Sequence, residues 1–376
     1  MTNKQTATPY DADVAIIGGG LVGLAIAVGL IKKNLNVVIF DEGDQAFRAS
    51  RGNFGLVWVQ GKGDTCVEYA RLSRLSAELW PGLADELSAV TGIDVQLEQN
   101  GGFFFCFSEE ELEQRIEMLK SMREAQDGDY PFEVLRQDEL KKRLPDIGPD
   151  VTGATFGPLD GHVNPLLMLR ALTEYFIKQG GKFVNNGSVK EITPEATGFS
   201  VVSEGQTYRY GKVVLAAGLG NKALAPLLGL EAPVEPNRGQ VLVAERVEPF
   251  LQYPTSHVRQ TREGTIQCGD SKEDVGFDEG TTTEVMAQIA KRAVTLFPKL
   301  AQAQLVRAWG ALRIMTPDGY PVYEQSQQYP GAYVVTCHSG VTLAAAHAGP
   351  IANWIAGEGF NLDFSMEVFS AKRFSV

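Results

Sequence analysis

The chain has few cysteines, and none of them form the close pairs that hold a metal or a redox dithiol. Its 376 residues include four cysteines, which are far apart in the sequence: Cys66, Cys106, Cys268 and Cys337. Without a C-x-x-C motif, no zinc ribbon, iron–sulfur cluster or thioredoxin-like site is expected within this chain. Scattered thiols of this kind favour a reducing compartment.

The sequence also lacks an excess of positive charge. It has 34 Lys and Arg against 46 Asp and Glu, for a formal net charge of −12. Because a field of that sign repels phosphate groups, nucleic-acid binding is not expected. The polar first twelve residues contain no apolar core of the kind that a secretory signal requires, so the expected location is the cytoplasm.

One uncharged run, residues 14–31, reaches the lower length limit of a membrane span, but its glycines indicate something else. Gly18, Gly20 and Gly23 follow a short apolar strand and open a helix, and a second strand ends at Asp41. In this G-x-G-x-x-G pattern the glycines provide a tight turn, a close approach to a pyrophosphate and close helix packing. The acid can accept hydrogen bonds from a ribose diol. The run therefore predicts dinucleotide binding, with NAD and FAD both still open.

Later segments continue the same α/β domain. The apolar strand in residues 212–220 ends in small residues that include Gly218, as expected where a sheet passes close to a cofactor, although an ordinary strand-to-helix turn is the alternative. Asn164 can cap a helix that begins at Pro165 and carries an apolar stripe starting at Leu166.

Two insertions interrupt this domain. The first contains a β-prone run and two predicted helices, the second contains two predicted strands and a helix, and neither has a repeat or a low-complexity linker. We therefore predict an α/β protein with a discontinuous dinucleotide-binding domain at 11–90, 151–230 and 308–376. The insertions, 91–150 and 231–307, are predicted to form a substrate domain over the cofactor.

The chain resembles the D-amino-acid oxidase or glycine oxidase type of FAD-dependent amine oxidoreductases. The resemblance covers nearly the whole chain and rests on IIGGGLVGLAIAVGL at 16–30, ASRGNFGLVW at 49–58, DGHVNP at 160–165, VVLAAGLG at 213–220, RGQVL at 238–242, WGALRIMTPDGYPVY at 309–323 and CHSGVTLAAAHAG at 337–349. It implies a Rossmann-like FAD-binding domain with a second, mainly antiparallel-sheet substrate domain. It implies no metal in this chain.

The resemblance implies that FAD is held by the glycine loop and Asp41. The loop that contains Ser50, Asn53 and Gly55 suits the pyrophosphate and the flavin edge, although a plain surface loop is the competing interpretation. Backbone amides at Ser339 and Gly340 precede a predicted helix from Leu343 onward and are expected to face the flavin pyrimidine.

Arg313 is the residue that the resemblance assigns to the substrate carboxylate, a role that suits the two parallel donors of a guanidinium. The alternative is a structural ion pair. Sarcosine oxidase-like relatives tether FAD through a cysteine close to this segment, where the present chain has none, so non-covalent FAD is predicted. His338 either tunes the flavin or caps its loop, and His257 and Trp58 are candidates for lining the pocket.

Within the family, the chain looks most like the catalytic β subunits of opine (octopine and nopaline) dehydrogenases, with proline or hydroxyproline dehydrogenases and hydrogen cyanide synthase as near relatives. Such subunits work with a partner that carries an iron–sulfur cluster and a second flavin, often with FMN at the interface. An opine joins two carboxylated arms, so a second cation is expected. The sequence spacing does not identify this second cation among four candidates, and the alternative for each is a surface or structural cation: Arg259, Arg51, Lys62 and Arg238.

The resulting prediction is a soluble dehydrogenase that moves a hydride from the substrate Cα to flavin N5, after which water cleaves the imine. No side-chain general base is required. The alternatives are an oxidase or dehydrogenase for a D-amino acid, glycine, sarcosine, proline or hydroxyproline, and a protein that binds FAD without catalysing a reaction.

Overall fold

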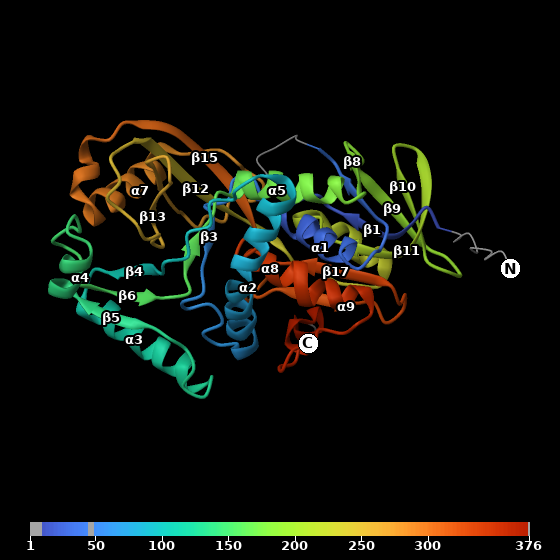
Figure 1. Cartoon of the computed structure of the whole chain (residues 1–376), viewed down its shortest axis with the longest axis horizontal. Coiled ribbons are helices and arrows are strands. Elements are labelled where there is room, and N and C mark those ends of the chain that lie inside the picture. The colour runs from blue at the N-terminus through green and yellow to red at the C-terminus, as the bar shows by residue number, and fades with distance from the viewer. Residues whose placement is uncertain (1–9, 44–48, 375–376) are drawn as a thin grey trace.

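A parallel sheet forms the centre of one half of the molecule (Figure 1). The computed structural model describes residues 10–43 and 49–374. The parallel strands are ordered β17 (Ala332–Thr336), β11 (Gln206–Leu215), β1 (Ala12–Ile17), β2 (Val37–Asp41) and β8 (Lys182–Asn185). Antiparallel strands extend this sheet: β16 (Val322–Gln325) pairs with β17, and β10 (Phe199–Ser203) pairs with β11 and with β9 (Val189–Pro194).

Helices cover one face of this sheet, because alternate strand residues point to opposite sides. Val14 and Ile16 pack with α1 (Leu21–Ile31), α2 (Val67–Thr91), α5 (Pro165–Lys178), α8 (Ala344–Ala346) and α9 (Ala352–Ala356). Ala15 and Ile17 pack on the other face, with β9, β10 and the segment that begins at α6 (Asn221–Leu224). Both faces are therefore buried, which explains the continuous apolar runs of β1 and β2.

Antiparallel sheets form the other half, at the opposite end of the molecule in Figure 1. One has the order β13 (Val258–Gln260), β14 (Thr265–Cys268), β12 (Glu235–Arg246) and β15 (Leu305–Met315). The other has the order β4 (Gly102–Cys106), β6 (Gly153–Gly157) and β5 (Glu133–Arg136). Around them lie α3 (Glu109–Glu124), α4 (Gln137–Arg143) and α7 (Thr283–Leu296), and the short strands β3 (Leu56–Val57) and β7 (Gly161–His162) pair with each other.

The strand pairing agrees with the predicted α/β fold class but crosses the predicted domain boundaries at two places. β6 lies within 151–230 and pairs with β4 and β5, and most of β15 lies within 308–376 yet pairs along its length with β12. Arg313 therefore belongs to the antiparallel sheet and not to the parallel one. The division into domains itself stays a prediction.

Helix α5 begins as predicted. The Asn164 side chain accepts hydrogen bonds from the backbone N–H groups of Leu166 and Leu167, both at 3.2 Å, and Pro165 occupies the first turn. The predicted stripe was wrong at Leu166, which is 57% exposed, because the buried face begins at Pro165 and Met168.

The helix expected from Leu343 onward is interrupted. A wider turn, His347–Ile351, separates α8 from α9, because Pro350 lacks the N–H that a regular helix would use and Gly349 leaves helical geometry. His347 is buried there, and its Nε2 lies 3.0 Å from the Tyr323 hydroxyl.

The longest helix, α2, was not predicted. Its buried residues follow a helical spacing that includes Tyr69 and Trp80, but Pro81 lies inside it and reads as a helix breaker. Pro81 cannot donate to the carbonyl of Ala77, and the side chain of Gln99 donates to that carbonyl instead, at 2.9 Å. A distant residue thus stabilises the helix at its weakest point, which the local sequence does not reveal.

Within residues 10–43 and 49–374, no helix has both the length and the apolar character needed to cross a membrane. The uncharged run 14–31 is divided between β1 and α1, with the glycine loop between them.

Helix α5 provides a test of which face supports the core. Phe176→Ala removes a fully buried ring and is expected to lower the free energy of unfolding by about 3–5 kcal/mol. Leu166→Ala, on the exposed face of the same helix, is expected to change it by less than about 0.5 kcal/mol. Urea unfolding followed by circular dichroism, at equal FAD saturation, measures both. Equal losses for the two variants would contradict this packing.

Candidate functional site: a cofactor cradle beside Arg313

The backbone around the glycine loop between β1 and α1 is packed so closely that it leaves no space for side chains at two of the glycines. Gly18 has φ +112°, and a Cβ there would lie 2.3 Å from the carbonyl oxygen of Ala216 at the end of β11. A Cβ on Gly23 would lie 2.0 Å from the carbonyl oxygen of Gly18. The loop therefore fits the backbone approach that a dinucleotide requires.

Asp41 and Ser50 hold this loop in place. The carboxylate of Asp41 accepts hydrogen bonds from the backbone N–H of Gly19 at 2.7 Å and of Gly43 at 2.9 Å. The hydroxyl of Ser50 accepts from the N–H of Leu21 at 2.9 Å, where α1 begins. An ionised carboxylate has further lone pairs, so Asp41 can still accept from a ribose diol. These contacts fit FAD binding at the predicted residues.

The loop after Ser50 lies against both halves of the molecule. Asn53 accepts a hydrogen bond from the N–H of Gly55 at 2.6 Å, and Gly55 has φ +90°. A Cβ on Gly52 would lie 2.3 Å from the Cβ of Ala311 in β15, and one on Gly218 would lie 3.4 Å from Ile314 in the same strand. The predicted cofactor loops thus meet the strand that carries Arg313.

The hydroxyl of Ser339 is the centre of a polar cluster. Lys62 donates to it at 2.6 Å, the Tyr69 hydroxyl lies 2.9 Å away and His338 Nε2 lies 3.2 Å away. Neighbouring Gly340 faces the glycine loop, since a Cβ on it would lie 3.4 Å from Val22. The segment after β17 is therefore next to the start of α1, where the cofactor cradle lies.

Burial shapes the charges in this cluster. Desolvation lowers the pKa of Lys62 to about 8. It also lowers the pKa of His338 to about 3, helped by the positive charges of Lys62 and Arg313, so the imidazole is neutral near pH 7. The hydrogen bond to Ser339 is compatible with either predicted role of His338, tuning the flavin or capping the loop.

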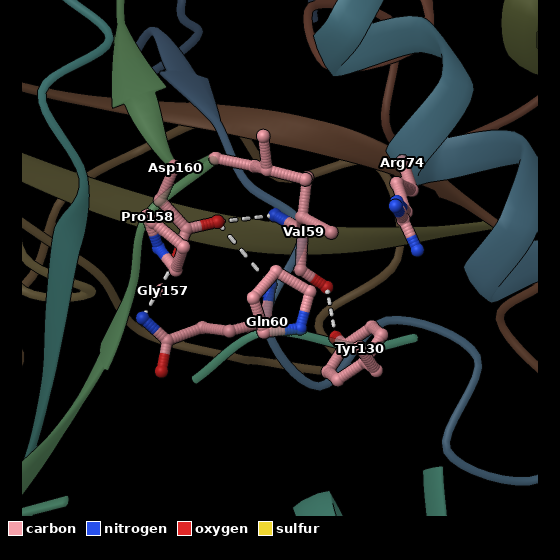
Figure 2. A pocket seen from close by; sticks show the side chains of 9 residues that line it. Val59, Gln60, Arg74, Tyr130, Gly157, Pro158 and Asp160 are labelled. Atoms are coloured by element: carbon pink, nitrogen blue, oxygen red, sulfur yellow. Dashed lines mark hydrogen bonds between the residues drawn. The ribbon is translucent and has the colours of Figure 1, made fainter. Parts of the chain in front are cut away.

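The loop that carries Lys62 is held by a buried carboxylate (Figure 2). Asp160 accepts hydrogen bonds from the backbone N–H of Val59 at 2.5 Å and from the side chain of Gln60 at 2.7 Å. The Tyr130 hydroxyl donates to the carbonyl of Val59 at 3.0 Å. Burial raises the pKa of Asp160 to about 7. The cavity beside these residues has a volume of about 10 Å³, which is room for about one water molecule, and we assign it a structural role.

Arg313 is surrounded by hydrogen-bond acceptors from β12 and from the segment that follows β14. It forms an ion pair with Asp270 and donates to the Asn237 side chain at 2.9 Å and to the Ser271 carbonyl at 2.9 Å. The structural ion pair considered from sequence is thus present. Arg313 is still partly exposed, with 22% of its side chain accessible, so a ligand can reach it.

The four candidates for a second substrate-binding cation differ in their burial and in their partners. Arg238 is already paired with Glu273 at 2.7 Å and Asp278 at 2.5 Å. Arg259 is buried against neutral acceptors, Gln267 Oε1 at 2.9 Å and His162 Nδ1 at 3.1 Å, and burial lowers its pKa to about 10. Arg51 is exposed. Lys62 is the one of the four that joins the Ser339 cluster.

His257 lies near the Arg313 contacts. Its Nδ1 is buried without a hydrogen-bond partner among the described residues, and its backbone carbonyl accepts from Gly269, beside Asp270. Burial and the charge of Arg292 lower its pKa to about 4. Trp58 donates its backbone N–H to the hydroxyl of Thr342 at 3.1 Å, next to the Ser339 segment.

The sequence analysis did not predict several residues that take part in the contacts around Ser339 and Arg313. Tyr69 belongs to the unpredicted helix α2, and its spacing on that helix was the available signal. Asp270 lies in an irregular segment after β14, where no periodicity marks it. In the described part of the chain, no group of three or more His, Cys, Asp or Glu side chains is arranged to hold a metal ion.

The fold and the glycine cradle define a dinucleotide-binding flavoprotein, and comparison with known proteins specifies which family. The model of the DAO family, FAD dependent oxidoreductase, matches residues 13–354, so the chain belongs to this family. It is 42% identical over 366 residues to an opine oxidase subunit from Rhizobium meliloti, covering 97% of this chain and 98% of that relative. It is 43% identical to the corresponding opine oxidase subunit from Agrobacterium tumefaciens, with the same coverage.

Among solved structures, glycine oxidase from Geobacillus kaustophilus superposes with a TM-score of 0.89 at 26% identity, covering 96% of this chain and 98% of that one. The predicted resemblance and fold class are confirmed. The roles of the individual site residues stay predictions.

A substitution in the cradle tests the cofactor site. A Cβ on Gly20 would lie 2.8 Å from the Ser50 hydroxyl, so Gly20→Val is expected to abolish FAD binding by filling the cradle. Gly82→Val is the matched control, because a Cβ on Gly82 meets no atom within 4 Å. Flavin absorbance per protein after gel filtration is the measurement. Full flavin content in Gly20→Val would contradict the assignment.

Proposed function

We propose that this chain is the catalytic subunit of an opine-oxidising enzyme, which breaks the C–N bond of a carboxylated secondary amine. The observation that carries the proposal is its 42–43% identity, over 97% of the chain, to two proteins named as opine oxidase subunits. The partly exposed guanidinium of Arg313, beside the cofactor loops, supports it from the structure.

In the proposed reaction FAD, bound without a covalent link, supplies the hydride acceptor. Arg313 binds the substrate carboxylate through two parallel hydrogen bonds and so orients the Cα–H bond. Asp270, which now pairs with Arg313, must give up or share that contact when the carboxylate arrives. Loss of the Cα hydride and the amine proton leaves an imine, which water cleaves to a keto acid and an amine.

The neighbouring side chains support this chemistry without a dedicated base. Burial keeps both His338 and His257 neutral, with pKa values of about 3 and about 4. Lys62 keeps a positive charge below its pKa of about 8 and donates to Ser339. A positive group beside the predicted flavin-facing segment favours negative charge there.

Electrons are proposed to leave through a partner subunit. The relatives are named as subunits, which supports a complex. The cysteines, all free, lie on separate elements, so an iron–sulfur relay and a second flavin would have to belong to the partner. On this proposal the chain acts as a dehydrogenase, with a stand-alone oxidase as the alternative.

Arg313→Ala is expected to slow reduction of the flavin by octopine or nopaline roughly thirtyfold to several thousandfold, while FAD stays bound. The reason is that losing a charge-assisted carboxylate contact costs about 2–5 kcal/mol. Anaerobic stopped-flow bleaching of the flavin measures the loss.

Asp270→Asn separates the two roles of Arg313. If the arginine only completes an ion pair, both variants lose the same function. If it binds substrate, Asp270→Asn retains reduction and binds the amine at least as tightly, because a competing carboxylate is gone. Reduction within threefold of wild type in Arg313→Ala would place carboxylate recognition elsewhere.

The partner proposal predicts slow reaction with oxygen. The isolated chain, reduced anaerobically by its best amine and then exposed to air, should reoxidise too slowly to sustain turnover. The full complex should turn over with an external acceptor. Reoxidation of the isolated chain at several turnovers per second, with stoichiometric peroxide, would instead establish a stand-alone oxidase.

A further inference from the structure

A path of hydrogen bonds connects the buried guanidinium of Arg259 with the loop that follows Ser50. Nη1 of Arg259, on β13, donates to the carbonyl of Val163 at 3.2 Å. The backbone N–H of Val163 donates to the carbonyl of Gly55 at 2.9 Å, and the N–H of Gly55 donates to Oδ1 of Asn53 at 2.6 Å. Arg259 is thus linked to Asn53, a predicted cofactor-binding residue, by a continuous set of contacts.

Arg259 also packs directly against this loop. Its guanidinium carbon lies 5.7 Å from the centre of the Phe54 ring. A Cβ on Gly55 would lie 2.9 Å from Nη2 of Arg259 and 2.5 Å from the carbonyl oxygen of Val163, and Gly55 has φ +90°. Position 55 therefore requires glycine, both for its backbone conformation and because the guanidinium occupies the space that a side chain would need.

The fold holds Arg259 in one orientation without an acid. Arg259 is 2% exposed and forms no ion pair with the residues that the structure describes. Its Nε donates to Gln267 Oε1 at 2.9 Å, and its Nη1 lies 3.1 Å from His162 Nδ1, which must accept because a guanidinium has only donors. A buried charge that no acid neutralises costs folding free energy, so filling space does not by itself explain an arginine here.

The amide of Asn53 keeps its own donors free. A backbone N–H donates to the oxygen of an amide and not to its nitrogen, so the bond from Gly55 fixes Oδ1 on the side of Gly55. Nδ2 makes no hydrogen bond with residues 10–43 and 49–374, and Asn53 is partly exposed. Its two N–H groups are therefore directed away from Gly55 and are available to a ligand.

The neighbours of Asn53 place these donors beside the cofactor cradle. Ser50 accepts from the N–H of Leu21 at the start of α1, and a Cβ on Gly20 would lie 2.8 Å from the Ser50 hydroxyl. Gly52, next to Asn53, packs on Ala311 of β15. The cofactor of this family, FAD, carries oxygen acceptors on its pyrophosphate and on its flavin ring. An amide donor between the cradle and β15 fits such an acceptor.

We propose that Asn53 donates from Nδ2 to an oxygen of bound FAD, and that Arg259 is the positioning residue that keeps the Asn53 amide in this orientation. Arg259 acts through Val163 and Gly55 and does not itself touch the cofactor. This role concerns FAD binding, so it does not depend on which amine the enzyme oxidises.

A double-mutant cycle tests the path. Asn53→Ala is expected to raise the dissociation constant for FAD roughly five- to hundredfold, the range for leaving one hydrogen-bonding group unpaired. Arg259→Met is expected to raise it at least about threefold, and the double variant should bind FAD as Asn53→Ala does, within about twofold, because the two residues act as a unit. Serial dilution of each holoenzyme, followed by the fluorescence of released FAD, gives the constants.

Two further arginine variants serve as controls. Arg259→Lys is expected to bind FAD within about threefold of the wild type, because the bonds to Val163 and His162 both come from Nη1, which one ammonium can replace. Arg246 is exposed at the end of β12 in the same half, so Arg246→Met removes the same charge away from the path. It is expected to bind FAD as the wild type does.

Independent effects would overturn the inference. If Arg259 only stabilises the fold, the losses of the two single variants multiply in the double variant. Unchanged FAD binding in Asn53→Ala or in Arg259→Met would also contradict it, as would an equal loss in Arg246→Met.

A second pair of measurements decides the matter if Arg259→Met does not fold, as judged by circular dichroism. In Asn53→Asp the carboxylate still accepts from Gly55 but no longer donates. Weakened FAD binding at about 0.5 M salt, where long-range repulsion is screened, supports the donor role, and wild-type affinity contradicts it. A folded Arg259→Lys that loses FAD as severely as Asn53→Ala would contradict the positioning role.

Discussion

The close packing of glycine-containing loops on strand β15 is the constraint on which the site depends. Gly52 lies against Ala311 and Gly218 lies against Ile314, where a side chain on Gly52 would displace the strand. The indole of Trp309 adds a hydrogen bond to the carbonyl of Gly52 at 3.1 Å. Because Arg313 lies between these contacts in sequence, the same packing that joins the two halves fixes the distance from the cofactor cradle to Arg313. In the proposed reaction, a shift of one half relative to the other would separate the cofactor from the substrate, and misalignment of that kind is costly in catalysis.

Local patterns predicted the cofactor half well, because its elements are specified by neighbours in the sequence. The strand, glycine loop, helix and acid around Gly18 and Asp41 occur in order, and the Asn164 cap needs only residues within one turn. The antiparallel half depends on contacts between residues that are far apart in the sequence, which local patterns do not show. The pairing of β15 with β12 joins residues more than sixty positions apart, which is why Arg313 was expected in the cofactor domain and lies in the antiparallel sheet.

The residues that were missed share a physical reason. Helix α2 survives Pro81 because Gln99 satisfies the carbonyl that the proline leaves free, and no window of α2 contains that residue. Asp270 lies in an irregular segment whose position is set by the ion pair of Glu273 with buried Arg238. In both cases a side chain from another element stabilises the local structure. Periodicity and capping rules consider only residues close in sequence, so they do not detect such contacts. The candidates for a second cation could not be ranked for the same reason, since pairing with acids decides which cation is available.

The cations of this protein differ in whether a neighbouring acid neutralises their charge, and this difference connects the fold to the proposed chemistry. A cation that stabilises the fold is paired with an acid or with a set of carbonyl oxygens. Arg238, for example, forms ion pairs with Glu273 and Asp278. Lys62 instead meets a hydroxyl, and its desolvated ammonium has a pKa lowered to about 8, so the protein bears a cost for keeping it in place. Such a cost is typical of functional sites, where a group is held for a ligand and not for the fold. The buried carboxylate of Asp160 holds the loop before Lys62, so even the support of this cation depends on a titratable group with a displaced pKa. The desolvated ammonium of Lys62 is therefore held in place by the fold, through the loop that Asp160 supports, in a chain whose formal net charge is −12.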